Sequence, residues 1–256
     1  MLDSDMDNQH HPSRVITFVV LGVALLGIWI FLVGPFHSIF PPEPRHRGRP
    51  PNADNLHMIG LAFHNYVDDN KCFPLAAIQN QDGEPLLSWR VALLPFLEEN
   101  ELYSQFHLDE PWDSPNNKPL LARIPKVYAP PGGKPAQEPF GTYYQVFVGP
   151  GAAFEDKARI NFGSFTDGCS NTILAIEAAE PVPWTKPEDL AFSPDQPLPR
   201  IGGESKYGAY CLHVDGSVRM IPKETDEKIL RALITRNGGE KLGTDDHGNW
   251  CFRPDE

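Results

Sequence analysis

The sequence predicts an α+β fold behind a single membrane-spanning helix, on the strength of three observations. Residues 15–36 contain no charged side chain. Residues 52–69 place apolar side chains at the spacing of an amphipathic helix. From residue 127 onward the pattern changes to short segments rich in β-branched and aromatic residues, which favour strands.

The apolar segment 15–36 is long enough for a transmembrane helix. At about 1.5 Å per residue it spans the roughly 30 Å hydrocarbon core of a bilayer. A cleaved secretory signal and a buried helix of a soluble protein are the alternatives. A signal peptide has an apolar core of about 7–15 residues and then small residues at its cleavage site, whereas this longer run ends in Gly34, Pro35 and Phe36. We therefore expect a retained anchor, preceded by a polar tail at residues 1–14.

Residues 37–51 are expected to form a linker between the anchor and the domain. Their five prolines exclude a helix and favour an extended, stiff spacer. The remaining residues, 52–256, provide enough chain for one domain with a sizeable core. Arg14 is the only Lys or Arg before the apolar segment and three arginines follow it, so the positive-inside rule alone would favour a cytoplasmic domain.

The composition limits the partners of this chain. Its net charge is −12, from 34 acidic and 22 basic residues, which argues against nucleic-acid binding because that needs a basic surface. Its 27 prolines, against a usual share of about 5%, indicate long loops and short elements. The four cysteines form no Cys-x-x-Cys pair, which argues against a zinc site and leaves disulfides and free thiols both open: Cys72, Cys169, Cys211 and Cys251.

The first helix of the domain is predicted over residues 52–69, with Asn52 or Asp54 as its cap. Its apolar stripe consists of Leu56, Ile59, Phe63 and Val67. On the neighbouring face, His64 and Asp68 are four residues apart and, with His57, are the best candidate for a metal cluster. A solvated helix flank explains them as well, so no metal site is predicted.

Turns and short helices are predicted in the middle of the chain. Residues 81–84 indicate a turn. Ser88 is expected to cap a helix over residues 89–94 that Pro95 ends, because proline inside a helix costs about 3 kcal/mol. A helix resumes over residues 98–106, and Ser114 is expected to cap another one with Pro115 at its first position.

Strands are predicted over residues 142–148 and 171–177, followed by a Pro-rich loop at 181–199. The clearest hairpin spans residues 207–221, with Asp215 and Gly216 as a two-residue turn. If Val214 lies opposite Ser217, one face carries Ala209, Cys211, His213, Val218 and Met220, and the other carries Tyr210, Leu212, Val214 and Ile221. Because both faces are largely apolar, we expect the hairpin to lie centrally in a sheet covered on both sides.

A last helix is predicted after the hairpin. Thr225 is expected to cap it, and Asn237, Gly238 and Gly239 are expected to end it. Its inner side would carry Ile229, Leu230, Leu233 and Ile234.

Several segments together carry a family resemblance. They are NLHMIGLAFHNYVDDNKCFP, LLSWRVALLPFLEENELYSQFHLDEPWDSPNN, TYYQVFVGPG, TDGCSNTI, PWTKPEDL and HVDGSVRMI. In this order they resemble domain-of-unknown-function family 1559, a large bacterial family abundant in planctomycetes. The resemblance covers about residues 52–239.

The resemblance implies a pilin-like domain, in which an N-terminal helix lies on an antiparallel sheet behind a membrane-spanning segment. The family is also described as prepilin-processing-associated, with a signature of His, nine residues and Asp-Gly. Counted back from Asp215, that histidine would stand at position 205, where this chain has Ser205. Pilin-like members join anchor and first helix, whereas prolines separate them here, which argues against a fibre built from continuous helices.

Catalytic chemistry finds little support in the sequence. Ser170, His213 and Asp215 are the residue types of a nucleophilic triad, but no serine lies in a Gly-x-Ser-x-Gly elbow. Asp215 and Gly216 are explained by the hairpin turn. Asp167 and Gly168 are explained by a turn before the next strand. We therefore expect no catalytic residue, no metal and no cofactor.

A ligand site is the other candidate. Trp89, Asp109, Trp112, Asp113 and Trp184 combine aromatic rings with carboxylates, which suits carbohydrate binding. A surface loop anchored by a tryptophan explains the same residues around position 112.

The apolar segment and the family resemblance, against the arginine bias, predict a single-pass membrane protein with its domain outside the cytoplasm. The domain would be a structural or interaction module of the cell envelope, with the lipid bilayer and a protein or a second copy as partners. The alternative is an extracytoplasmic module that binds a carbohydrate or another solute.

Overall fold

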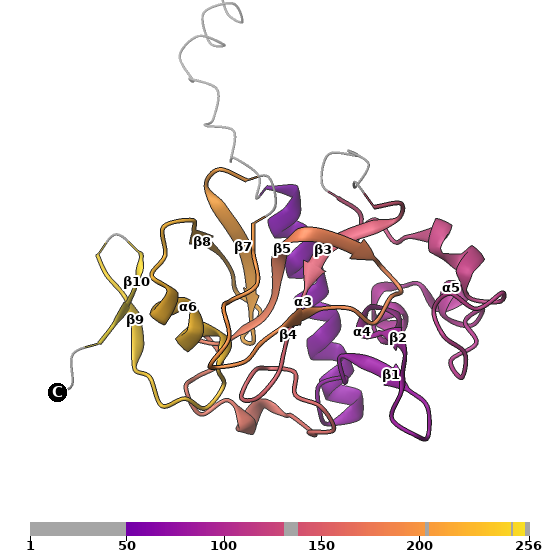
Figure 1. The fold of residues 1–256 in the computed structure, drawn as a ribbon, viewed down its shortest axis with the longest axis horizontal. Coiled ribbons are helices and arrows are strands. Elements are labelled where there is room, and N and C mark those ends of the chain that lie inside the picture. Colours follow the sequence, from indigo (N-terminus) through magenta and orange to yellow (C-terminus); the bar gives the residue numbers. More distant parts are fainter. Residues whose placement is uncertain (1–49, 131–137, 203–204, 247, 254–256) are drawn as a thin grey trace, which may run out of the picture. The chain divides into compact units, whose positions relative to one another are not determined.

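The computed structural model describes residues 50–130, 138–202, 205–246 and 248–253, and these form an α+β fold (Figure 1). The predicted tail, the predicted anchor at residues 15–36 and the linker up to residue 49 lie outside the described residues. Among the described helices, none combines the length and the apolar character needed to cross a bilayer.

A four-stranded antiparallel sheet forms the centre of the fold. Its strand order is β3 (Gly141–Gln145), β5 (Ile173–Pro183), β7 (Gly208–His213) and β8 (Val218–Pro222). Both strands predicted before the hairpin are present, although β5 runs six residues beyond Glu177 into the expected Pro-rich loop. β7 lies inside the sheet, whereas β8 is its edge strand.

One face of this sheet is covered by α3 (Pro51–Asn70), the predicted first helix. Leu56, Ile59, Phe63 and Val67 are all buried, which confirms the predicted stripe. Gly60 allows the close approach, because a Cβ there would lie 2.7 Å from a methyl carbon of Leu212 on β7. The helix, the sheet and the 73–130 segment thus share one large core.

The predicted caps of α3 are wrong. Pro50 occupies the cap position without a side-chain hydrogen bond, and Pro51 occupies the first turn, where proline's missing N–H costs nothing. Asn52 instead donates to the carboxylate of Glu177 on β5 at 2.8 Å. Its side chain therefore joins the helix to the sheet.

The other face of the sheet packs on α6 (Glu227–Ile234) and the hairpin of β9 (Leu242–Thr244) and β10 (Trp250–Phe252). Asp226, one residue after the predicted Thr225, caps α6 by accepting from the Lys228 N–H at 2.7 Å. Leu233 and Ile234 are fully buried in this second core. All four cysteines are free thiols.

The β7–β8 turn has three residues rather than the predicted two. His213 lies opposite Ser217, with Val214, Asp215 and Gly216 between them, and Gly216 has φ +84°. This is the three-residue loop in which a glycine in the left-handed region closes a type I turn. A shift of one residue in register moves the side chains of a strand to the opposite face of the sheet. Ile221 therefore lies with Cys211 in the second core, whereas Val218 and Met220 lie on the side of Leu212.

The segment before the sheet is more irregular than predicted. Residues 81–84 do form a turn, but within an unpredicted hairpin of β1 (Ala77–Gln79) and β2 (Pro85–Ser88). Ser88 caps α4 (Trp89–Ala92) as expected, accepting from the Arg90 N–H. The helices that follow are shorter than expected or begin later: η1 (Leu94–Leu97), α5 (Asn100–Tyr103) and η2 (Lys118–Arg123).

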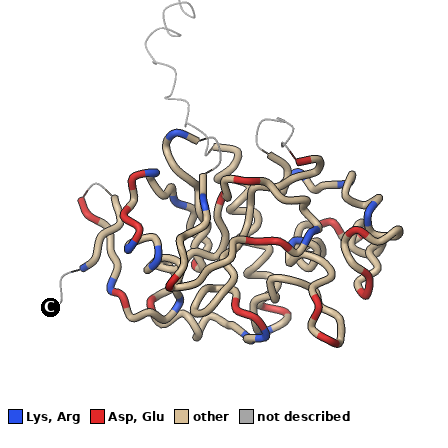
Figure 2. The backbone as a smooth tube through the Cα atoms, viewed as in Figure 1, with Lys and Arg blue, Asp and Glu red and all other residues tan. Residues whose placement is uncertain are grey.

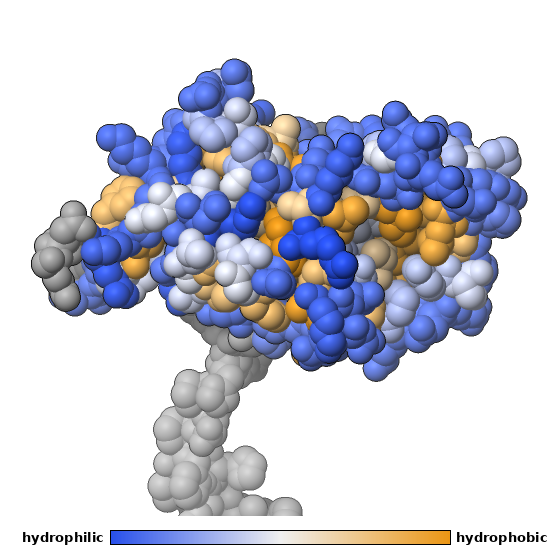
Figure 3. Space-filling model, turned by 90° about the horizontal axis from the view of Figure 1, so that it is seen from below, coloured by the Kyte–Doolittle hydropathy of each residue, from blue (hydrophilic) through white to orange (hydrophobic). Residues whose placement is uncertain are grey.

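Short elements complete the described fold. β4 (Phe147–Val148) pairs in parallel with β6 (Leu190–Ala191), and η4 (Phe162–Ser164) forms a single turn. Acidic and basic residues alternate around the described chain in Figure 2 rather than separating into two halves. On the face shown in Figure 3, apolar side chains lie in islands and in a hollow within a mostly hydrophilic surface.

Gly216→Val is expected to destabilise the domain by more than about 1 kcal/mol, since a β-branched residue fits poorly at positive φ. A Cβ at this position would also lie 3.3 Å from the His64 ring. The matched control is Gly239→Val, because Gly239 has φ +88° but nothing within 4 Å of an added Cβ. Urea denaturation followed by tryptophan fluorescence should give a larger loss for Gly216→Val, and an unchanged midpoint would contradict the turn.

Candidate functional site

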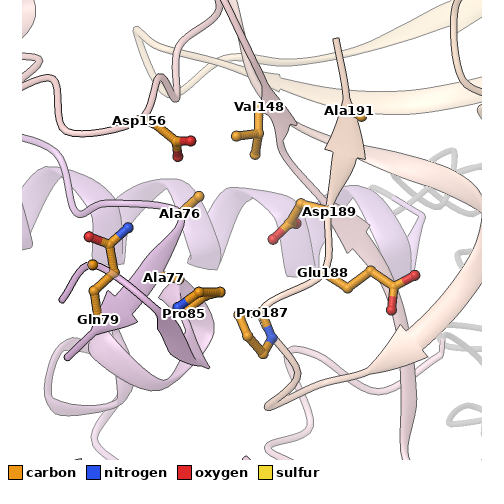
Figure 4. Close-up of a pocket in the computed structure, with 11 residues that line it drawn as sticks. Ala76, Ala77, Gln79, Pro85, Val148, Asp156, Pro187, Glu188, Asp189 and Ala191 are labelled. Atoms are coloured by element: carbon orange, nitrogen blue, oxygen red, sulfur yellow. The ribbon is translucent and has the colours of Figure 1, made fainter. Parts of the chain in front are cut away.

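A candidate site is a cavity of about 390 Å³ beside β1, β2 and β6. Most of the side chains that line it are small and apolar, and its polar side chains are carboxylates and one amide. Figure 4 shows the carboxylates of Asp156 and Asp189 pointing into this space, while that of Glu188 points away. The apolar walls are Ala76, Ala77, Pro85, Val148, Pro187 and Ala191.

Asp189 is held in place by a buried network. Its Oδ1 accepts from the guanidinium of Arg90 at 2.8 Å, from the N–H of Val146 at 3.0 Å and from the indole of Trp89 at 3.2 Å. The Asp189 side chain is 3% exposed and that of Arg90 is fully buried. All three donors reach the same oxygen, so the second one, Oδ2, is available to the cavity.

Each of the three guanidinium nitrogens of Arg90 donates a hydrogen bond to a nearby group. Nε and Nη2 donate to the carbonyl of Tyr144 at 2.9 and 2.7 Å, and Nη1 donates to the Ser88 hydroxyl at 2.6 Å. Burial raises the pKa of the Asp189 carboxyl, and the Arg90 guanidinium acts against that rise. The network therefore presents a fixed acceptor oxygen at the cavity wall.

The predicted ligand residues are not brought together. Trp89 and Trp184 are fully buried, with their indole N–H groups bonded to Asp189 and to the carbonyl of Leu121, so neither ring can face a sugar. Trp112 is partly buried under the ammonium of Lys186, 5.7 Å from its ring centre. Asp109 and Asp113 are exposed beside it.

The two predicted turn motifs have further contacts that the sequence does not indicate. The Asp167 carboxylate accepts from the N–H groups of Gly238 and Gly239 at 2.6 and 3.0 Å, and so ties the turn to the segment after α6. Gly168 has φ +101°, as its turn requires. Asp215 accepts from the N–H and hydroxyl of Ser217 within its own hairpin.

The triad residue types do not form a catalytic arrangement. Nε2 of His213 lies 3.4 Å from the sulfur of Cys211, and Asp215 bonds to Ser217. Burial lowers the pKa of His213 to about 4 and raises that of the Cys211 thiol to about 12. The pair is therefore neutral at pH 7, whereas a nucleophilic thiol must be ionised.

The candidate metal residues do not form a cluster, and His64 has a structural contact of its own. His64 Nε2 bonds to the Val214 carbonyl at 2.8 Å, which joins α3 to the β7–β8 turn. His57 and Asp68 are exposed, and His107, a possible further ligand from another segment, lies 3.4 Å from Glu110. Over the described ranges, no three His, Cys, Asp or Glu side chains are grouped as metal ligands.

Asp189→Ala is expected to destabilise the domain by roughly 3–5 kcal/mol, because it leaves the buried Arg90 guanidinium without its counter-charge. The matched control is Arg200→Ala, in an ion pair with Glu180 whose side chains are 84% and 73% exposed. This control should change the free energy of unfolding by less than about 0.5 kcal/mol. Similar urea midpoints for both variants would contradict the structural role of the buried pair.

His213 should make the domain less stable in acid. Its pKa of about 4 in the folded state lies below the usual value of 6.5, because burial and Arg219 disfavour its charge. Between about pH 6.5 and pH 4 the histidine is protonated in the unfolded chain but not in the folded one. The free energy of unfolding therefore falls as the pH is lowered over this range, by up to about 3 kcal/mol. Denaturation at several pH values should show a shallower decline for His213→Gln, and identical pH profiles would contradict this assignment.

Comparison with known protein families identifies the family of this chain. A family described as a protein of unknown function (DUF1559) matches residues 53–206. No curated protein matches the chain. No solved structure matches it either. The family match begins two residues into α3, includes β3 and β5 of the central sheet and both sides of the cavity, and covers more than half of the sequence. The chain therefore belongs to the DUF1559 family.

Proposed function

We propose that this protein is a membrane-anchored, non-catalytic structural or interaction domain of the cell envelope, with pilin-like architecture and its domain outside the cytoplasm. The observation that carries the proposal is the long helix α3 lying along one face of the antiparallel sheet, directly after a Pro-rich segment that follows an uncharged apolar run. Pilin-like domains have the same order of anchor, helix and sheet. Membership of the DUF1559 family adds to this support.

The absence of a catalytic role is part of the proposal. A nucleophilic site needs a nucleophile, a base and an orienting group within hydrogen-bond reach. The neutral pair of His213 and Cys211 is enclosed between the sheet and Trp250, whose ring centre lies 5.3 Å from that of His213. This position favours a packing role for the pair.

The acid-lined cavity favours a second candidate, a module that binds a carbohydrate or another polar solute. Carboxylate oxygens accept hydrogen bonds from hydroxyl groups, and Asp189 is fixed by Arg90 in a position where it can do so. A solute-binding role predicts that Asp156→Asn, at an exposed position, lowers ligand affinity without changing stability. A purely structural domain would show no saturable solute binding at this cavity.

The proposed topology predicts that protease added to intact spheroplasts digests the domain. The retained anchor predicts that the chain sediments with membranes after a carbonate wash. The control is a cytoplasmic protein of the same cells, which must stay intact until the membrane is lysed. Full protection of the domain would overturn its extracytoplasmic position, and release by carbonate would overturn the anchor.

A further inference from the structure

A second stripe of α3 points away from the sheet. Met58, Leu61, Asn65 and Asp68 follow one another at helical spacing, next to the buried stripe of Ile59 and Phe63. Met58 is 50% exposed and Leu61 is 52% exposed, although both lie on a helix that is packed along its other side. Burial of the rest of these two side chains would be favourable, and within the described chain about half of each stays exposed.

This stripe forms one wall of a groove of about 620 Å³. The other wall is η1, which contributes Pro95, Phe96 and Leu97. The ring of Phe96 packs edge-on against that of Tyr66 on α3, with 5.5 Å between ring centres. The groove is thus bounded by two helices that the core holds in place, and its apolar wall is preformed.

One end of the groove is acidic. Asp68 and Asp69 line it, Glu98 follows η1 on the other wall of the groove, and within the described ranges none of these three carboxylates is in an ion pair. Lys71 lies at the same end, with its ammonium on the backbone carbonyl of Asp68. The groove therefore offers an apolar patch followed by negative charge, in the direction from Met58 towards Asp68.

This order of side chains disfavours a second copy of the chain as the occupant. Two grooves facing each other in parallel would bring carboxylates against carboxylates. Two antiparallel grooves would bury the carboxylates of one copy on Met58 and Leu61 of the other, which is costly for unpaired charges. The complementary partner carries apolar side chains followed by positive charge.

We propose that the groove between α3 and η1 binds a basic amphipathic segment of another protein. Two apolar side chains of that segment would cover Met58, Leu61 and Phe96, and its Lys or Arg side chains would pair with Asp68, Asp69 and Glu98. This is the mode in which an amphipathic helix lays its apolar face into a groove. The inference rests on one part of the proposed function, the role as an interaction domain. It does not depend on the orientation of the domain in the membrane.

The experiment uses the full chain in nanodiscs of phosphatidylcholine, whose lack of net charge limits attraction of a basic probe to the lipid. The probe is a fluorescein-labelled helical peptide with two leucines on one face and two lysines one to two turns later on the same face. Fluorescence anisotropy should show saturable binding that weakens with added salt. Peptides with the leucines changed to serine, or the lysines to glutamate, should bind at least roughly tenfold more weakly.

Two variants of the chain test the site. Leu61→Glu should weaken binding of the leucine–lysine peptide by roughly tenfold or more, and Asp68→Asn together with Asp69→Asn should weaken it and flatten its salt dependence. The matched control is Met220→Glu, because Met220 is 42% exposed on the edge strand β8. The control should bind as the unmodified chain does.

The proposal is overturned if the unmodified chain shows no saturable binding. It is also overturned if Leu61→Glu, with an unchanged melting curve, binds as well as Met220→Glu, because binding would then reflect only the overall acidity of the chain. Failure of this experiment leaves the protease result on spheroplasts unaffected. Conversely, if the domain is cytoplasmic and binds the peptide, the proposed topology is wrong and the proposed binding groove stands.

Discussion

The buried ion pair of Arg90 and Asp189 joins parts of the chain that are about one hundred residues apart. Arg90 lies two residues after the Ser88 cap, and its guanidinium also bonds to the carbonyl of Tyr144 on β3. Removal of two charges from water costs several kcal/mol for each ion, and the pair offsets that cost only while its hydrogen bonds are complete. The position of α4 against the sheet and the position of Asp189 at the cavity therefore depend on each other.

The sheet divides the molecule into two cores, and strand β7 belongs to both. Leu212, together with Val214 just after the strand, faces the core of α3, whereas Ala209 and Cys211 face that of α6. Polar contacts tie the same strand to its neighbours: His64 bonds to Val214, and Glu177 accepts from the N–H of Tyr210 at 2.8 Å. Burial raises the pKa of Glu177, while its two donors oppose that rise. His64 thus joins α3 directly to the β7–β8 turn, and Glu177 links the first turn of α3 to β7 through Asn52.

Sequence patterns predicted the parts of this fold that depend on local periodicity. The stripe of Leu56 to Val67 and the glycine of the 215–216 turn follow from helical spacing and from backbone sterics, and both are confirmed. The register of the hairpin was wrong by one residue, because both faces of β7 are apolar and the pattern does not distinguish them. Trp89 and Trp184 were candidate ligand-binding residues, but both are buried, and their burial depends on partners about a hundred and about sixty residues away. The cavity was missed since Asp189 becomes a fixed acceptor only through Arg90, a contact that no local pattern encodes.

The start of α3 limits how such a domain can associate. Pro50 and Pro51 lie at its first turn, and a helix continuing upstream would place both in its interior, at about 3 kcal/mol for each. The residue before a proline also avoids the helical region of backbone space. A helix that continues through Pro50 and Pro51 is therefore disfavoured, whereas pilin-like fibres are built on long continuous helices. The association that we propose then uses the surface of the domain itself. On α3 that surface is the stripe from Met58 to Asp68, where exposed apolar side chains and unpaired carboxylates follow one another along the same helix.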